Sequence, residues 1–186
     1  MLRKLLLSSL LALAPLAGSA QTVLLKTSAG DIRIQLDAAK APKTVANFLQ
    51  YVKAGHYNGT VFHRVISDFM IQGGGFTPQM QQKPTRAPIP IESHNGLSNV
   101  RGSVAMARTG DPNSATAQFF INVVDNQRLD ADMSPDGFGY TVFGKVSSGM
   151  EAVDKIRAVP VTDRGMHANV PETPILILKA SVETKK

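Results

Sequence analysis

Helical periodicity is confined to two short segments of this chain, and a long strand-rich stretch separates them. The first segment follows Pro42 and has Val45, Phe48 and Val52 along one face, whereas the second spans 149–157. A parallel sheet requires a helix or another long crossover between successive strands, and two widely separated helices cannot supply these crossovers. The pattern therefore favours an antiparallel β fold.

Eight segments have the apolar and β-branched composition of short strands. The predicted strands are 22–27, 31–36, 62–66, 69–72, 102–107, 117–123, 140–146 and 174–178. Residues 77–99, which include four prolines, are expected to form a surface loop. We expect a mainly β fold, a closed eight-stranded antiparallel barrel capped by two α-helices, because closure removes the exposed strand edges.

Residues 1–20 have the three-part pattern of a secretory signal peptide: a basic start, an apolar run and a group of small residues. We expect cleavage after Ala20, which leaves 21–186 as one domain. The alternative is a membrane anchor. The apolar run is shorter than the about 20 residues that span a bilayer, and Pro15 interrupts it. The sequence thus predicts export, with no stable membrane association after cleavage.

Charge and composition exclude several classes of site. The formal net charge is +6, or +4 without the basic pair of the leader, and no dense Lys/Arg block suggests a nucleic-acid partner. The chain has no cysteine, so it has no disulfide and no thiolate metal site. The four histidines lack metal-ligand spacing, and no Gly-x-Ser-x-Gly motif marks a nucleophilic serine. We therefore expect neither a metal nor a covalent intermediate.

The most informative side chains lie in 62–66 and the strand that follows it. Strand alternation predicts that Phe62, Arg64 and Ile66 share one face. If the two strands pair, Gln72 lies beside Arg64. A neutral amide partner leaves the charge of a guanidinium available, whereas a carboxylate partner would neutralise it.

Other residues of this stretch have simpler interpretations. Gly73, Gly74 and Gly75 would let another backbone, such as a bound peptide, approach closely. His63 is expected to be a hydrogen-bonded structural histidine, and an arginine on a strand is more often a surface residue than a catalyst. Composition and spacing alone indicate an exported β-barrel domain with an apolar site.

The order of residues is more specific. The run Phe-His-Arg-Val-Ile-x-x-Phe-Met-Ile-Gln-Gly-Gly-x-Phe at 62–76 resembles the signature of the cyclophilins, the peptidyl-prolyl cis/trans isomerases. Four further blocks agree with the family in order, and they are 41–48, 101–107, 114–122 and 138–146. The resemblance covers about Thr22 to Val182. Together with the leader, it is strongest to the periplasmic cyclophilins of Gram-negative bacteria.

The resemblance implies roles for ten residues. Arg64 would be the catalytic arginine, and Gln72 would position it and touch the substrate backbone. The residues that would line the proline pocket are Phe69, Met70, Phe120, Leu129 and Tyr140. The residues that would flank the part of the substrate preceding the proline are Ala107, Arg108 and Gln118.

The resemblance also implies the partners. The substrates would be unfolded or partly folded proline-containing polypeptides in the periplasm, and the enzyme would act as a monomer without a cofactor. Arg128 departs from the family, which commonly carries an aromatic residue at this position, and Tyr140 stands where eukaryotic members often have histidine. Two other hypotheses remain: a non-catalytic proline-peptide-binding chaperone module, and a barrel that carries a small ligand.

Overall fold

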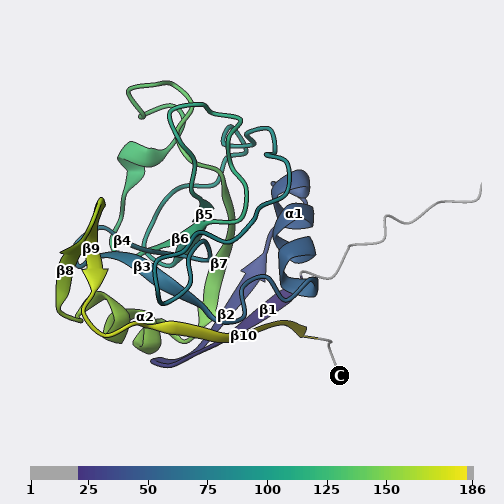
Figure 1. Ribbon diagram of the computed structural model, residues 1–186. Coiled ribbons are helices and arrows are strands. Elements are labelled where there is room, and N and C mark those ends of the chain that lie inside the picture. Colours follow the sequence, from purple (N-terminus) through teal and green to yellow (C-terminus); the bar gives the residue numbers. More distant parts are fainter. Residues whose placement is uncertain (1–20, 184–186) are drawn as a thin grey trace, which may run out of the picture.

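Eight antiparallel strands close into a barrel in the computed structural model, which describes residues 21–183 (Figure 1). The strands are β1 (Thr22–Thr27), β2 (Gly30–Leu36), β3 (Thr60–Ile66), β4 (Met70–Gly73), β5 (Ser103–Met106), β6 (Phe119–Asn122), β7 (Val142–Ser148) and β10 (Leu176–Glu183). Their order around the barrel is β1-β10-β3-β4-β6-β5-β7-β2. The predicted fold class is confirmed. The predicted signal peptide lies outside the described residues.

Two helices pack their apolar faces into the same core as the barrel strands: α1 (Pro42–Lys53) and α2 (Met150–Arg157). Pro42 stands in the first turn of α1, where its missing N–H costs no hydrogen bond. Gly55 follows the helix with a φ of +67°, a conformation that glycine adopts without strain. Within residues 21–183, neither helix is long and apolar enough to cross a membrane.

The first turn of α1 receives its cap from a distant segment. Ala41 precedes the helix and has no side chain that could accept the free backbone N–H groups. The Glu92 carboxylate instead accepts hydrogen bonds from the backbone N–H groups of Lys43, at 3.1 Å, and Thr44, at 2.8 Å. Glu92 belongs to the predicted loop 77–99, and this contact holds that loop against the helix.

Aromatic rings fill the part of the core beneath α1. The Phe48 ring of this helix lies 5.2 Å from Tyr57, 5.6 Å from Phe119 and 5.0 Å from Phe143, measured between ring centroids. The Tyr57 hydroxyl is buried and donates a hydrogen bond of 2.8 Å to the Ala117 carbonyl. Aromatic packing therefore joins α1 to β6 and β7, the strands that carry part of the site described below.

The structure adds elements that the sequence pattern did not predict. A two-stranded hairpin of β8 (Val161–Arg164) and β9 (His167–Pro171) follows α2, and a short 3₁₀ helix, η1, spans Gln127–Leu129. The predicted closing strand 174–178 is wrong in extent, because β10 runs on to Glu183. Pairing with β1 extends β10 through residues of weak strand propensity, which sequence periodicity cannot detect.

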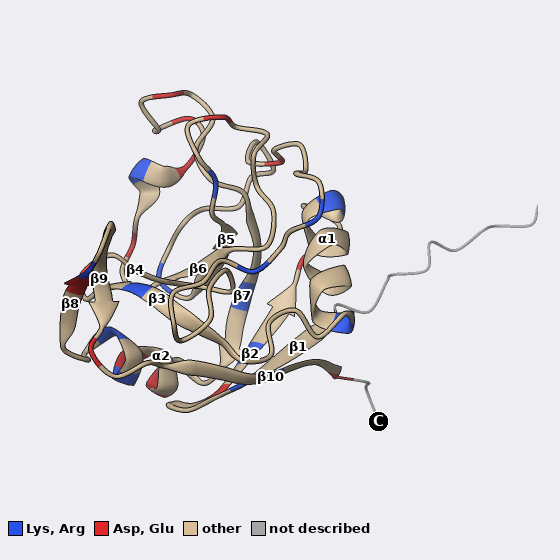
Figure 2. Cartoon of the chain, viewed as in Figure 1, with Lys and Arg blue, Asp and Glu red and all other residues tan. Residues whose placement is uncertain are grey.

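Charged residues of both signs are interspersed over the described chain (Figure 2). Basic and acidic side chains meet in specific pairs, such as Arg33 with Glu183 at 3.0 Å and Arg101 with Asp154 at 2.8 Å. This distribution agrees with the scattered charge of the sequence.

Candidate active site

Alternation gives four neighbouring strands an inner and an outer set of side chains. Ile71 of β4 and Phe119 and Ile121 of β6 belong to the core that fills the barrel. Met70 and Phe120, their neighbours in sequence, belong to a second and smaller apolar cluster on the opposite face. The barrel therefore carries an apolar surface outside its own core.

We call this second group the outer cluster. Its buried members are Met70, Ala105, Phe120 and Val142. Its partly buried members are Ile66, Phe69, Leu97, Ala107, Leu129 and Tyr140. All five residues predicted to line a proline pocket are members, so the structure brings together side chains that are far apart in sequence. The signature did not point to Ala105 or Val142, although the alternation of β5 and β7 could have placed them.

A β-bulge in β3 determines the direction of Arg64. Phe62 pairs with Gly73 and Arg64 pairs with Gln72, so β3 has one more residue than β4 between these pairs. Phe62 consequently faces the core and Arg64 the outer side. The prediction that Phe62, Arg64 and Ile66 share one face is wrong for Phe62, because a bulge shifts the alternation by one residue.

Arg64 is the first member of a relay of polar side chains. Its Nη1 donates to Gln72 Oε1 at 3.5 Å, the long end of the range for a hydrogen bond, and Gln72 Nε2 donates to Gln118 Oε1 at 2.9 Å. The second contact orients the Gln72 amide so that its oxygen faces the arginine. Among the described residues, no carboxylate lies within ion-pair distance of Arg64. The predicted Arg64–Gln72 contact is confirmed.

The three glycines make room for the protein's own side chains. A Cβ on Gly74 would come within 2.7 Å of the Tyr57 ring, and φ at Gly74 is +85°. A Cβ on Gly75 would come within 2.6 Å of the Gln118 side chain. Tyr57 and Gln118 thus fill the space into which a Cβ at Gly74 or Gly75 would point, and the approach of a bound backbone to these glycines stays a prediction.

The side chain of Arg108, which the resemblance implied at the flank of the substrate, is bonded within the protein. It donates 2.8 Å and 2.9 Å hydrogen bonds to the carbonyls of Gly139 and Thr109 and forms an ion pair with Asp136. Its guanidinium carbon lies 4.6 Å from the centroid of the Tyr140 ring. These intramolecular partners occupy the Arg108 guanidinium, whereas Ala107 and Gln118 are partly exposed.

Arg128 stacks on the edge of the outer cluster. Its guanidinium carbon lies 5.0 Å from the centroid of the Phe69 ring, within the range of a cation–π contact. A cationic plane thus covers an aromatic member of the cluster at the position where the family commonly carries an aromatic ring.

Three buried asparagines form a hydrogen-bond network next to the outer cluster. Asn126 Nδ2 donates to the Phe69 carbonyl at 2.7 Å and to Asn122 Oδ1 at 2.8 Å. Asn122 Nδ2 in turn donates to Asn99 Oδ1 at 3.2 Å. The network ties the turn that carries Phe69 to the strand that carries Phe120. The sequence pattern does not reveal this network, because asparagines far apart in a sequence look like ordinary turn residues.

His63 is a buried neutral side chain. It is 5% exposed, its ring packs 4.6 Å from that of Phe76, and its Nδ1 has no hydrogen-bond partner among the described residues. Burial is the main cause that lowers the pKa of His63 to about 4, and the nearby His167 and Arg64 act in the same direction. The ring is therefore uncharged at neutral pH, which agrees with a structural role, but the predicted hydrogen bond is not made at Nδ1 by any described residue.

Neither the histidines nor the carboxylates make a metal site. Within residues 21–183, no three of them are grouped so that they could hold an ion. The chemistry available at the outer cluster is therefore that of an apolar surface beside a guanidinium with amide partners.

Comparison with known proteins identifies the family. The family model described as "Cyclophilin type peptidyl-prolyl cis-trans isomerase/CLD" matches residues 22–182. This chain is a cyclophilin-type peptidyl-prolyl cis/trans isomerase. Its reaction is rotation about the peptide bond that precedes proline in a polypeptide substrate.

Relatives in bacteria and a solved structure agree with the assignment. This cyclophilin is 59% identical over 162 residues to peptidyl-prolyl cis-trans isomerase cyp18 of Streptomyces antibioticus, a match that covers 87% of the chain and 98% of the relative. It is 55% identical over 157 residues to peptidyl-prolyl cis-trans isomerase B of Escherichia coli K12, with 84% and 96% covered. A crystal structure of a Cryptosporidium parvum cyclophilin, determined in the presence of the dipeptide Ala-Pro, has a TM-score of 0.76 at 27% identity and covers 89% of this chain and 100% of that one.

The contact between Gly75 and Gln118 leads to a first prediction. Gly75→Ala places a Cβ against the middle of the Gln118 side chain and should displace its amide, because the clash involves a flexible side chain and not backbone. Gln72 then loses the contact that orients it toward Arg64. We expect kcat/KM on a prolyl peptide to fall roughly 10-fold, as for the loss of one positioning contact, with little change in Tm. Gly110→Ala is the control, since its Cβ would enter open space. Equal activity of the two variants would contradict the relay.

Burial of neutral His63 leads to a second prediction, on stability. The unfolded chain protonates this ring near pH 6.5, whereas the lowered pKa of about 4 keeps it neutral in the folded cyclophilin. The stability gained by burying the neutral ring is thus fully present above pH 6.5 and is lost as pH falls toward 4. His63→Phe should remove this loss, and its free energy of unfolding relative to wild type should improve by roughly 2 kcal/mol between pH 7 and pH 5.

Urea unfolding at the two pH values measures this difference. The exposed His94 provides the control, because His94→Gln also removes an imidazole but not one buried in the core. If wild type and His63→Phe lose stability in parallel between pH 7 and pH 5, His63 is not the buried group that causes it.

Proposed function

We propose that Arg64 is the catalytic residue of this isomerase and that the outer cluster holds the proline ring of the substrate. Phe69, Met70, Phe120 and Leu129 would contact the ring, with Tyr140 as one wall. The observation that carries the proposal is the position of an unneutralised guanidinium, held by neutral amides, at the margin of an apolar surface. Gln118 ends the relay that begins at Arg64, Ala107 belongs to the outer cluster, and we assign both to the residues that precede the proline.

The reaction requires only that the twisted amide bind more tightly than either planar form. Resonance in the X–Pro bond opposes rotation with a barrier of about 18–20 kcal/mol, and spontaneous exchange takes tens of seconds. A guanidinium N–H directed at the prolyl nitrogen stabilises a pyramidal nitrogen, whose lone pair no longer conjugates with the carbonyl. The apolar surface meanwhile holds the ring as the preceding carbonyl turns. Stabilisation that appears only in the twisted state accelerates rotation.

Electrostatics supports Arg64 in this role. A carboxylate partner would hold the guanidinium and reduce the field that it directs toward the substrate, whereas an amide oxygen orients it without cancelling its charge. Gln72 occupies the partner position, and Gln118 determines which end of the Gln72 amide faces Arg64. A purely binding module would require the apolar surface but not this relay.

Substitution of Arg64 tests the catalytic assignment. Arg64→Ala should leave Tm close to that of wild type, because the side chain faces outward, and should lower kcat by about 100-fold or more, as removal of a single transition-state donor does. Arg64→Lys retains the charge but not the planar fork, and should recover only part of the rate. A cis/trans assay on a prolyl peptide measures both variants.

Arg33→Ala is the matched control, since it removes an arginine that pairs with Glu183 at the other side of the barrel. Full turnover in Arg64→Ala would overturn the assignment. If Arg64→Ala loses turnover but suppresses client aggregation as well as wild type does, chaperone binding and isomerisation are separate activities of one surface. The non-catalytic hypothesis requires instead that Arg64→Ala leave both measurements unchanged.

We further propose that the protein is exported and works in the periplasm on unfolded or partly folded proline-containing polypeptides. Support comes from the three-part leader in 1–20 and from the absence of cysteine, which makes folding independent of the redox state of the compartment.

Expression of the full chain in a Gram-negative host tests the export. The mature protein should begin at Gln21 in its mass spectrum and should appear in the periplasmic fraction, because cleavage accompanies export. A variant with Leu10→Arg, which interrupts the apolar run, is the control and should remain in the cytoplasm at full length. Recovery of full-length wild-type protein from the cytoplasm would contradict the proposal.

A further inference from the structure

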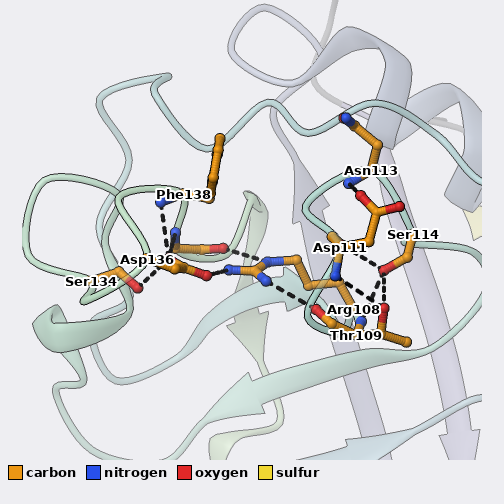
Figure 3. A network of polar contacts seen from close by, with 9 residues as sticks. Arg108, Thr109, Asp111, Asn113, Ser114, Ser134, Asp136 and Phe138 are labelled. Carbon is orange, nitrogen blue, oxygen red and sulfur yellow. Dashed lines mark hydrogen bonds and ion pairs between the residues drawn. The ribbon is translucent and has the colours of Figure 1, made fainter.

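Arg108 is a buried arginine whose three side-chain nitrogens all have partners within the protein (Figure 3). Its side chain is only 4% exposed, so the guanidinium is not presented to a ligand. Nε and Nη1 donate to the carbonyls of Gly139 and Thr109, and Nη2 pairs with Asp136. A planar fork can satisfy three such directions at once, whereas a lysine ammonium on its flexible stem cannot.

Asp136 is preorganised to receive this fork. Its Oδ1 accepts hydrogen bonds from the Ser134 hydroxyl at 2.7 Å and from the backbone N–H groups of Phe138 and Gly139 at 2.9 and 3.1 Å. The other oxygen, Oδ2, is left for Arg108. The Ser134 hydroxyl and the Arg108 guanidinium, with the two backbone donors, hold the pKa of Asp136 far below its usual range. The carboxylate therefore stays ionised at neutral pH.

The guanidinium joins two chain segments that both carry members of the outer cluster. Residues 107–118 connect β5 to β6 and carry Ala107 and Gln118, and residues 129–140 carry Leu129 and Tyr140 at their two ends. Arg108 belongs to the first segment, and its contacts with Asp136 and Gly139 reach the second. Within the first segment, Ser114 accepts hydrogen bonds from Thr109, which keeps that loop closed as well (Figure 3).

The guanidinium also contacts the cluster directly. It lies 4.6 Å from the centroid of the Tyr140 ring, and that ring meets the Phe120 ring edge-on at a centroid distance of 5.6 Å. The Tyr140 backbone N–H donates to the Leu129 carbonyl at 2.9 Å, which joins the ends of the second loop. An unbroken series of contacts thus leads from the Arg108–Asp136 pair to three members of the outer cluster, Tyr140, Phe120 and Leu129.

We propose that Arg108 is a positioning residue that clamps 107–118 to 129–140, so that Tyr140 and Leu129 are held in place before the proline ring binds. Arg108 itself does not touch the substrate. The inference rests on the proposed function in one respect, namely that the outer cluster holds the proline ring. A surface that is already ordered avoids the free-energy cost of fixing loops and side chains on binding. Loss of the clamp should therefore weaken binding and leave the rotation step at Arg64 intact.

Asp136→Asn is the decisive variant. An asparagine oxygen can still accept from Phe138 and Gly139, so the turn persists while the charge that holds Arg108 is lost. We expect KM for a prolyl peptide to rise about 10-fold and kcat to change by less than about twofold. Arg108→Lys should likewise raise KM with little change in kcat. The double variant should have a KM no higher than that of either single variant, because each substitution removes the same Arg108–Asp136 interaction.

The matched control is the pair Arg101–Asp154, in which another arginine bonds both oxygens of an aspartate and donates to a backbone carbonyl, the one of Val123. This pair lies on the α2 side of the barrel, so Arg101→Lys and Asp154→Asn should lower Tm without raising KM. A KM that rises equally in these controls would show a general effect of stability. An unchanged KM in Asp136→Asn alongside a raised KM in Arg108→Lys would show direct contact of Arg108 with the substrate. Either result overturns the proposal.

Titration with a short prolyl peptide, followed by NMR at the Tyr140 ring, separates this inference from the proposed function. Shifts of Tyr140 in wild type, with a Kd that weakens about 10-fold in Asp136→Asn, support the clamp without reference to turnover. If the peptide does not shift Tyr140 in wild type, the outer cluster is not the proline site and the proposed function fails. Wild-type shifts with the same Kd in Asp136→Asn overturn the clamp alone.

Discussion

One additional residue in β3 determines how this barrel presents its catalytic candidate. Strand alternation gives each position a choice of only two faces, and the phase set by Phe62 in the core would turn Arg64 inward as well. The bulge between these two residues reverses the phase. A guanidinium in the dry core without a carboxylate would be very costly, so the same irregularity preserves the core and supplies the outer surface with its cation.

Beyond the bulge, the site depends on side chains that position one another. Gly75 lacks the Cβ that would displace Gln118, Gln118 orients the amide of Gln72, and Gln72 contacts Arg64. On the other flank, Asp136 orients Arg108, which lies against Tyr140. The two arginines differ in what faces them. Arg64 has a neutral amide partner and keeps its field for a ligand, whereas Arg108 has a carboxylate and acts on the protein itself.

The sequence predicted much of this because its strongest signals are local. Alternation at Ile32, Ile34 and Leu36 and the apolar face of α1 are properties of neighbouring residues, and both were confirmed. Antiparallel closure followed from the wide separation of the two helices. The match of several blocks in order predicted which residues gather at the outer cluster, although those residues come from β4, β6 and the loops that precede and follow them. The extent of β10 and the presence of the β8–β9 hairpin were missed, because each is stabilised by pairing between strands and not by local periodicity.

The sequence by itself thus determined the barrel, the family and many of the side chains that gather in the outer cluster. Only the tertiary structure decided how those side chains are placed and which partners they contact. The bulge places Arg64 on the outer side of the barrel. Tyr57 and Gln118 pack beside Gly74 and Gly75, and the Arg108 side chain is buried in its ion pair with Asp136. Each of these outcomes depends on contacts between segments that lie far apart along the chain. Such contacts exist only once the barrel has closed, because closure is what brings those segments within the few ångströms over which hydrogen bonds and steric contacts act.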